Sequence, residues 1–273
     1  MVGELVYSRT FPIADMLRPR VIPCLLIQNG GLVKTVRFGS PKYVGDPINA
    51  VRIFNEKEVD ELMVVDIDAT VHDVEPNYEL IENLASECRM PLCVGGGIRS
   101  VDQIERIIGL GVEKVALSAA CIANPQIVAE ACVNVGSQSV VAVLDVKRET
   151  DGHYGVYTHN GLRATGRNPV SLAQELESLG IGEVIVNTID ADGEMKGYDL
   201  DLMRLMRHAV STPLTILGGA GCLEDMEAVI REHGAVGVAA GSLFVFKGIY
   251  KAVLINYPNP AAKDELFARA GSG

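Results

Sequence analysis

Short apolar runs alternate with amphipathic segments along most of this chain. The apolar runs are rich in Val, Ile and Leu, and they predict strands at 21–27, 62–67, 92–94, 115–117, 140–146, 184–189, 214–217 and 236–240. Because nearly every position in these runs is apolar, both faces of each strand must be buried, which is typical of a parallel sheet.

The segments between the strands have the spacing of amphipathic helices, clearest at 101–110, 125–135, 171–179 and 223–232. The pairs Asp46-Pro47 and Asn124-Pro125 each fit an N-cap residue followed by proline in the first turn. Eight strands that alternate with helices over about 250 residues predict an α/β fold, the (β/α)8 TIM barrel. An open doubly wound sheet is the alternative, and the lack of a GxGxxG sequence after the first strand argues against it.

The chain also contains an internal repeat. The stretch 61–69 resembles the stretch 183–191, which lies 122 residues further along, and the same offset brings 96–97 onto 218–219. One repeat covers half of the predicted barrel, so we expect two similar half-barrels. The expected organisation is an N-terminal extension at 1–15, the barrel at 16–258 and a C-terminal tail at 259–273.

The composition is that of a globular protein, with 273 residues of which 48% are hydrophobic. The net charge is −11, and no basic block is present, so we expect no nucleic-acid partner. The sequence contains no apolar run of about 18 residues, so we expect no membrane span. The six cysteines form no CxxC pair and indicate free thiols, and the first fifteen residues lack the apolar core of a secretory signal. These features predict a cytoplasmic protein.

Two glycine-rich turns follow the third and seventh predicted strands, at 95–97 and 218–221. The C-terminal ends of barrel strands form the active face, and glycine lets backbone N–H groups approach an anion closely. Two such turns in symmetric halves favour a small ligand with a phosphate at each end. The alternative is that these glycines only make tight turns.

Carboxylates at strand ends are candidates for acid–base chemistry: Asp66, Asp68, Asp145, Asp190 and Asp192. Asp145 ends the fifth strand, and alignment of the two halves places Leu26 at the equivalent position of the first strand. Leucine cannot transfer a proton, so the expected pair of carboxylates is broken. A capping or salt-bridged role is the alternative for Asp145.

Four charged residues stand at the starts of strands, namely Arg20, Glu61, Lys114 and Glu183. They predict a neutral ring across the bottom of the barrel, and on geometry alone a stabilising salt-bridge layer is favoured. The five histidines form no HExxH sequence and no paired Cys/His spacing, so we expect no metal site. No cofactor is expected either.

The motifs together resemble a known family. Between about Met16 and about Phe246, stretches such as 30–34, 94–98, 190–193 and 218–221 resemble the cyclase subunit of imidazole glycerol-phosphate synthase. This resemblance implies a half-barrel-repeat (β/α)8 enzyme of the histidine biosynthesis family that binds a substrate with two phosphates. It also implies a glutaminase-type amidotransferase subunit docked on the barrel bottom, whose ammonia passes through the barrel.

The resemblance implies roles by position. Asp145 becomes the general acid or base, and Lys34 becomes a substrate-loop lysine. The phosphate-site positions are Gly97, Asp192, Gly193, Gly219 and Ser242. The four charged residues Arg20, Glu61, Lys114 and Glu183 match those that gate ammonia entry in the family.

The chain also departs from the family pattern. Leu26 replaces the essential strand-one aspartate, Gln28-Asn29 replaces a lysine and an aspartate, and Ser118-Ala119 replaces an Asn-Thr pair. Loss of one positioned acid or base costs roughly 10²–10⁴-fold in rate, so the cyclase chemistry is compromised while the ammonia-entry end is kept. This combination resembles a divergent branch found with surface-polysaccharide genes. Its members act with a glutaminase-like subunit and a sugar amidotransferase to convert an N-acetyl group to an acetamidino group.

We therefore expect an ammonia-channelling barrel for acetamidino-sugar formation, without efficient cyclase activity. The alternative is a working imidazole glycerol-phosphate cyclase, a lyase of histidine biosynthesis, in which Asp66 or Asp192 replaces the missing acid. A second alternative is a scaffold that activates the glutaminase and has no reaction of its own.

Overall fold

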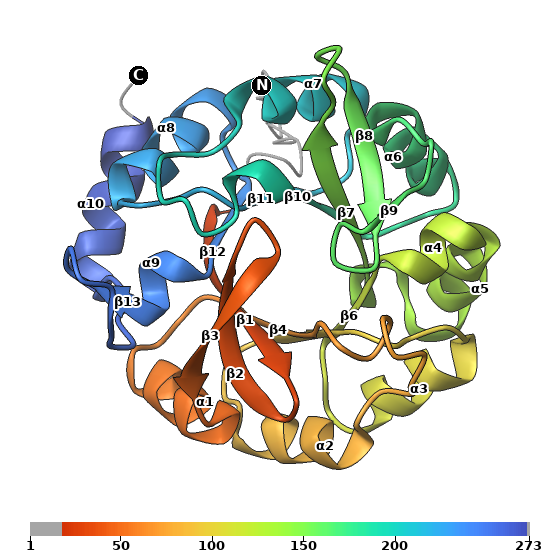
Figure 1. The fold of residues 1–273 in the computed structure, drawn as a ribbon, viewed down its shortest axis with the longest axis horizontal. Coiled ribbons are helices and arrows are strands. Elements are labelled where there is room, and N and C mark those ends of the chain that lie inside the picture. Colours follow the sequence, from red (N-terminus) through yellow and green to blue (C-terminus); the bar gives the residue numbers. More distant parts are fainter. Residues whose placement is uncertain (1–17, 272–273) are drawn as a thin grey trace, which may run out of the picture.

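Eight parallel strands close into a barrel in the computed structural model, which describes residues 18–271 (Figure 1). In order around the barrel they are β1 (Arg20–Gln28), β4 (Leu62–Asp66), β5 (Leu92–Gly95), β6 (Lys114–Leu117), β7 (Val140–Arg148), β10 (Glu183–Thr188), β11 (Leu214–Leu217) and β12 (Gly237–Ala240). Because β12 pairs in parallel with β1, the sheet has no edge here. The predicted (β/α)8 barrel is confirmed, and the open sheet is excluded.

Helices surround the barrel: α1 (Pro47–Glu56), α2 (Tyr78–Glu87), α3 (Val101–Gly109), α4 (Ala119–Ala123), α5 (Gln126–Val135), α6 (Pro169–Ser178), α7 (Leu200–Ala209), α8 (Leu223–His233), α9 (Ser242–Val245) and α10 (Pro260–Gly271). Short 3₁₀ turns occur at Ser137–Ser139 and Ile189–Ala191. Asp46 caps α1 as predicted, because its side chain accepts a hydrogen bond from the Asn49 backbone N–H at 2.8 Å. The cap predicted at Asn124 is wrong, since Asn124 is the C-cap of α4 and Pro125 takes the N-cap position of α5.

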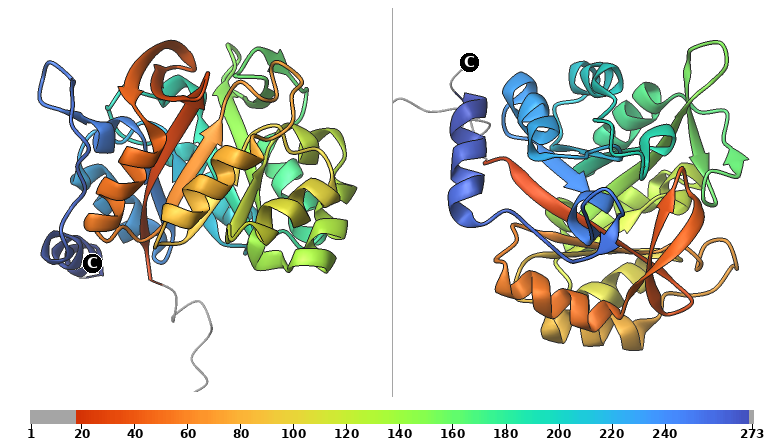
Figure 2. Two further views of the ribbon diagram at one scale, coloured as in Figure 1. Left: turned by 90° about the horizontal axis from the view of Figure 1, so that it is seen from below. Right: turned by 60° about the vertical axis from the view of Figure 1, so that its left-hand side comes forward.

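Each half of the barrel carries an antiparallel hairpin above the strand ends (Figure 2). Strands β2 (Gly31–Val36) and β3 (Gly39–Gly45) extend β1, while β8 (Tyr154–Thr158) and β9 (Arg163–Ala164) extend β7. Asp68 accepts from the backbone N–H of Asn29 at 2.8 Å, and Asp190 accepts from that of Arg148 at 2.9 Å. The same contact therefore supports the base of both hairpins, in keeping with two similar halves.

The chain ends in a hairpin and a helix. Strands β13 (Phe246–Lys247) and β14 (Ala252–Val253) form the hairpin, and α10 then packs against α8 with Leu266 fully buried. This helix occupies most of the segment that the sequence assigned to a tail. The extension expected at 1–15 lies outside the described residues. No helix of the described part is long and apolar enough to cross a membrane.

The core has two shells. The inner shell fills the barrel and contains Ile22, Cys24, Met63, Cys93, Val141, Ile185, Leu217 and Ala239. The outer shell lies between the strands and the helices and includes the fully buried Phe54 and Leu144. All six cysteines are free, as the sequence indicates. The inner shell separates the two ends of the barrel, so each end can carry its own polar groups.

Candidate functional site

A cavity of about 410 Å³ opens among the C-terminal ends of the strands. Its inner end is apolar and is lined by Cys24, Leu26, Met63, Val65 and Leu217. Polar groups line the wall, including Asp66, Asp145 and the glycine turn at 95–97. The cavity therefore lies on the face of the barrel where the sequence placed the active site, and it is large enough for a small metabolite.

Asp145 is the carboxyl in this cavity with the most perturbed acidity. Burial raises its pKa to about 7, and the charge of Asp192 adds to this rise. The Asn187 side-chain amide donates to Asp145 Oδ1 at 2.8 Å, which favours the charged form but does not offset burial. A carboxyl with such a pKa can both give and accept a proton near neutral pH, as a general acid or base requires.

Leu26 occupies the position of Asp145 in the other half of the barrel. Leu26 pairs with Val65 in the ladder between β1 and β4, and Asp145 pairs with Asn187 in the ladder between β7 and β10. Val65 and Asn187 are themselves related by the 122-residue repeat. The alignment made from the sequence is confirmed, and the cavity has one carboxyl where the repeat provides two equivalent positions.

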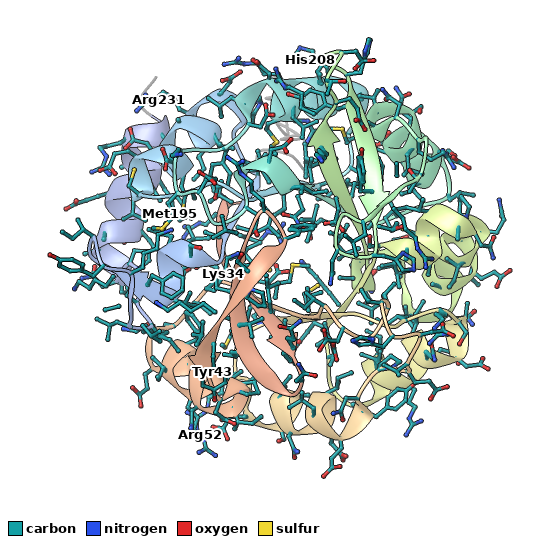
Figure 3. The ribbon with its side chains drawn as sticks, viewed as in Figure 1. Lys34, Tyr43, Arg52, Met195, His208 and Arg231 are labelled. Atoms are coloured by element: carbon teal, nitrogen blue, oxygen red, sulfur yellow. The ribbon has the colours of Figure 1, made fainter. Side chains whose placement is uncertain are left out.

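Lys34 is buried on strand β2, in the hairpin of β2 and β3, and lies near the centre of the barrel face (Figure 3). Its ammonium lies 2.5 Å from Asp192 Oδ1 and donates to the Thr35 carbonyl at 3.0 Å. The Thr35 hydroxyl and the Phe38 N–H donate to Asp192 Oδ2 at 2.7 and 3.2 Å. Asp192 thus ties the hairpin of β2 and β3 to the turn after β10.

The predicted phosphate positions fall into two places. Gly97 lines the large cavity, while Asp192, Gly193, Gly219 and Ser242 line an adjoining cavity of about 40 Å³. Gly193 has φ +72°, and a Cβ there would approach the Thr35 carbonyl to 2.4 Å. The second site is therefore filled largely by the hairpin of β2 and β3. The two cavities share walls at Leu26, Phe38 and Asn187.

The remaining candidate carboxylates have structural contacts. Asp66 accepts from the N–H groups of Asp68 and Ala69 at 2.9 and 3.1 Å, and Asp68 and Asp190 hold the two hairpins. Burial raises the pKa of Asp66, and it lines the large cavity, so it retains access to a ligand. Asp68 and Asp190 do not line either cavity.

His159 is a cavity residue that the sequence analysis did not single out. It lies in the turn between β8 and β9, where His159 and Asn160 both have positive φ, +54° and +55°. Burial and the nearby charge of Arg163 lower its pKa, and Arg163 lies 3.0 Å from its Nε2. The Asn160-Gly161 pair is a hairpin-turn signal that could have revealed this loop.

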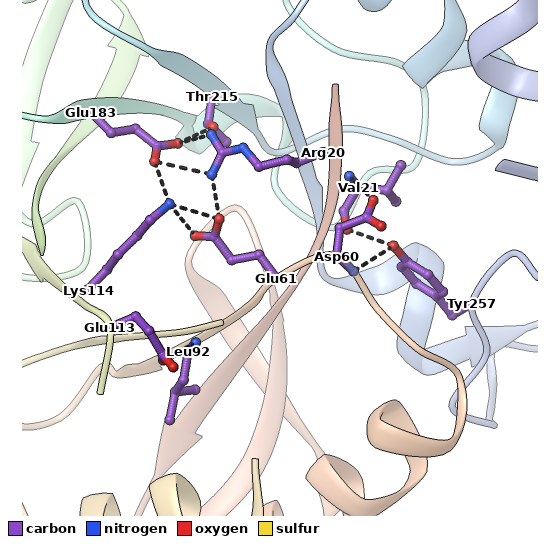
Figure 4. A network of polar contacts seen from close by, with 10 residues as sticks. All are labelled: Arg20, Val21, Asp60, Glu61, Leu92, Glu113, Lys114, Glu183, Thr215 and Tyr257. Atoms are coloured by element: carbon purple, nitrogen blue, oxygen red, sulfur yellow. Dashed lines mark hydrogen bonds and ion pairs between the residues drawn. The ribbon is translucent and has the colours of Figure 1, made fainter. Parts of the chain in front are cut away.

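The four charged residues predicted at the strand starts meet on the barrel axis at the opposite end (Figure 4). Lys114 Nζ lies 2.8 Å from Glu61 Oε2 and 2.9 Å from Glu183 Oε2. Arg20 pairs with Glu61 and, at 2.7 Å, with Glu183. We call Arg20, Glu61, Lys114 and Glu183 the charge ring. Each cation bridges both carboxylates, so the ring is closed and neutral.

The charges of the ring stabilise one another. Glu61 and Glu183 are only 3% and 4% exposed, so ionisation must be supported by partners. Burial opposes ionisation of Glu183, but Arg20 and Lys114 more than offset it, and its pKa is lowered. Burial likewise opposes the charge of Lys114, yet the two glutamates raise its pKa. Arg20, Lys114 and Glu183 therefore remain charged at neutral pH.

The interior between the charge ring and the cavity is apolar. Ile22, Met63, Cys93, Val141 and Ile185 are each at most 3% exposed. An ion that entered such a layer would lose its hydration, so the layer disfavours charged species. Among the described residues, no group of three or more His, Cys, Asp or Glu side chains could hold a metal ion.

Comparison with known proteins identifies close relatives. Residues 20–251 match the family described as "Histidine biosynthesis protein". The chain is 53% identical over 253 residues to the "Putative imidazole glycerol phosphate synthase subunit HisF" of Leptospira borgpetersenii, covering 92% of this chain and all of the relative. It is 54% identical over 249 residues to the "Putative imidazole glycerol phosphate synthase subunit hisF3" of Vibrio vulnificus (strain YJ016), covering 91% and 96%.

Proposed function

Because the chain belongs to the histidine biosynthesis protein family, we propose that it is the ammonia-accepting barrel of a glutamine amidotransferase complex. The charge ring closes the barrel bottom, an apolar interior follows, and the cavity that contains Asp145 lies beyond. A glutaminase-type subunit on the bottom face would release ammonia at the charge ring. Asp145 would handle protons at the other end.

The reaction that we propose is amidation of an N-acetyl group to an acetamidino group on a sugar for surface polysaccharide. The observation that carries it is Leu26 facing the cavity at the position equivalent to Asp145. Ring closure to an imidazole needs two proton-transferring groups, as the family resemblance implies, and this cavity has one in that pair. In the proposed reaction a partner sugar amidotransferase first transfers a phosphoryl or nucleotidyl group from a nucleoside triphosphate to the acetyl oxygen. Ammonia then adds to the acetyl carbon and loses a proton, the C–O bond breaks, and the oxygen leaves with the transferred group.

A second candidate is an imidazole glycerol-phosphate cyclase of histidine biosynthesis. The names of the relatives favour it. Asp145 is present, Asp66 lines the same cavity with a raised pKa, and the phosphate-position glycines are kept. Asp66 would then have to supply the second proton transfer. A scaffold that only activates the glutaminase would instead leave Asp145 without a role.

The test combines the barrel with its glutaminase, a sugar amidotransferase, a nucleoside triphosphate and an N-acetylated nucleotide sugar. It supplies glutamine labelled with ¹⁵N in the side-chain amide. Mass spectrometry follows the label. The proposal expects ¹⁵N in an acetamidino sugar, and it expects Asp145→Asn to abolish that product while glutaminase stimulation persists. Label in an imidazole product instead would assign the barrel to histidine biosynthesis. Unchanged labelling with Asp145→Asn would identify a scaffold.

A further inference from the structure

The two glutamates of the charge ring have different surroundings (Figure 4). Glu183 Oε1 accepts a hydrogen bond from Thr215 Oγ1 at 2.6 Å, in addition to its contacts with Arg20 and Lys114. Thr215 is fully buried. Within residues 18–271, Glu61 has Arg20 and Lys114 as side-chain partners and receives no hydroxyl hydrogen bond.

The internal repeat shows which residue of the first half corresponds to Thr215. The 122-residue offset that relates Glu61 to Glu183 also relates Cys93 to Thr215. Both are fully buried, and each lies on the strand next to its glutamate. A thiol is a much weaker hydrogen-bond donor than a hydroxyl. The two halves of the ring therefore have equivalent arrangements, but a thiol stands beside Glu61 where a hydroxyl donates to Glu183.

The neighbouring strand shows why Thr215 can make this bond. Thr215 pairs with Gly237 in the ladder between β11 and β12. A Cβ on Gly237 would lie 1.8 Å from Thr215 Oγ1. In the first half, the strand beside Cys93 instead carries Lys114 at the paired position. The absence of a side chain at Gly237 thus leaves room for the Thr215 hydroxyl beside Glu183.

These contacts have a consequence for opening of the charge ring. For ammonia to pass along the barrel axis, at least one ion pair of the ring must separate. Glu183 is held by Arg20 through two contacts, by Lys114 and by Thr215. A hydrogen bond to a charged group shifts an equilibrium by roughly tenfold or more, so separation at Glu61 costs less than separation at Glu183.

We propose that Thr215 is a positioning residue that anchors Glu183, so that the charge ring opens on the Glu61 side. This inference rests on the proposed entry of ammonia through the ring. Thr215 touches no reacting group of the cavity, and it acts only through Glu183. Without it both carboxylates can move, and the ring opens without coupling to ammonia delivery.

The test uses the barrel with its glutaminase and compares Thr215→Val, which removes the hydroxyl at nearly constant volume, with Thr215→Ser, which retains it. Thr212→Val is the matched control, because Thr212 is also buried and donates to Glu177 Oε1 at 2.8 Å, away from the ring. Thr215→Val should lower the product formed per glutamine consumed by several-fold, and more than it lowers ammonium-dependent product formation. Thr215→Ser and Thr212→Val should match the unmodified chain. Equal coupling in Thr215→Val and the control would overturn the proposal.

A second measurement separates this inference from the proposed function. In the isolated barrel, ¹³C NMR titration of the glutamate carboxyls should show a higher pKa for Glu183 in Thr215→Val than in Thr215→Ser, which keeps the hydroxyl donor. If this shift occurs but no ammonia is channelled, the hydrogen bond anchors Glu183 and the proposed function fails. If Glu183 does not respond to Thr215→Val, the anchor itself is refuted.

Discussion

Leu26 and Asp145 occupy equivalent positions in the two halves of the barrel, and both line the same cavity. The ladder partners of these two residues also differ, since Val65 is aliphatic and Asn187 carries a polar amide. The first half presents two aliphatic side chains where the second half presents a carboxyl and an amide. At these paired positions the two halves therefore differ in chemistry, although their places in the strand ladders are equivalent.

Leu26→Asp should restore a second proton-transferring group. We expect ammonium-dependent cyclase turnover to rise by roughly 10²-fold, the low end of what a positioned acid or base provides. The new carboxylate should also raise the pKa of Asp145 further, because like charges disfavour ionisation. Leu26→Asn is the control of the same shape without a transferable proton. Equal turnover in the two variants would show that residue 26 does not limit the cyclase reaction.

Asp145→Asn should stabilise the barrel at neutral and higher pH. The folded-state pKa of about 7 lies above the ordinary value of 3.8, so the folded chain holds this proton more tightly than the unfolded chain. The stability that Asp145 contributes is complete below about pH 4 and is lost as the pH rises to about 7. The melting temperature of Asp145→Asn relative to the unmodified chain should therefore increase over this range and then level off. At pH 8 the free energy of unfolding of Asp145→Asn should exceed that of the unmodified chain by on the order of a few kcal/mol.

Asp151→Asn serves as the control for this pH series. Asp151 is an exposed carboxylate near His153, and its pKa is lowered by hydrogen bonds from His153. Its replacement should leave the melting temperature nearly unchanged between pH 5 and pH 8. A constant difference between Asp145→Asn and the unmodified chain across the series would mean that Asp145 does not titrate near pH 7.

Lys114→Ala should uncouple glutamine use from product formation. The substitution leaves Glu61 and Glu183 with Arg20 as their one cation in the ring, so the ring loses its neutrality and its closure. We expect glutamine-dependent product formation to fall more than ammonium-dependent product formation, and the melting temperature to drop because a buried carboxylate loses a partner. Lys263→Ala is the control, since Lys263 pairs with Asp60 at 2.5 Å outside the ring. Equal losses by both routes in Lys114→Ala would point to a purely structural layer.

Asp192→Asn should release the hairpin of β2 and β3. The buried Lys34 would lose its carboxylate, and an unpaired buried ammonium is strongly unfavourable. We expect faster proteolysis within the hairpin and a larger second cavity that admits phosphate-bearing ligands. Limited proteolysis followed by mass spectrometry measures this, with Asp190→Asn as the neighbouring control. Unchanged cleavage in Asp192→Asn would mean that other contacts hold the hairpin closed.

The barrel could be predicted because its signals are local. The apolar runs of β7 and β10 predict buried strands. The two similar halves of the sequence are sufficient to relate Leu26 to Asp145. The charge ring could also be predicted, since its four residues begin strands and inward-facing positions at strand starts converge on the axis.

The hairpins and their contacts could not be predicted in the same way. Strand β3 is mostly exposed, so it lacks an apolar pattern, and His159 sits in a turn that faces the cavity only through tertiary folding. The pairing of Lys34 with Asp192 joins positions 158 residues apart and depends on how the hairpin lies over the barrel. Helix α10 was missed because its burial rests largely on Leu266 and Ala270.

The most direct test of the account is cyclase turnover by the purified barrel. The assay supplies the two-phosphate precursor of imidazole glycerol phosphate together with ammonium at high pH. The account predicts no turnover above background from a folded barrel that still stimulates its glutaminase. Ordinary turnover would contradict it, because Leu26 would then be compensated by another group and the barrel would act in histidine biosynthesis.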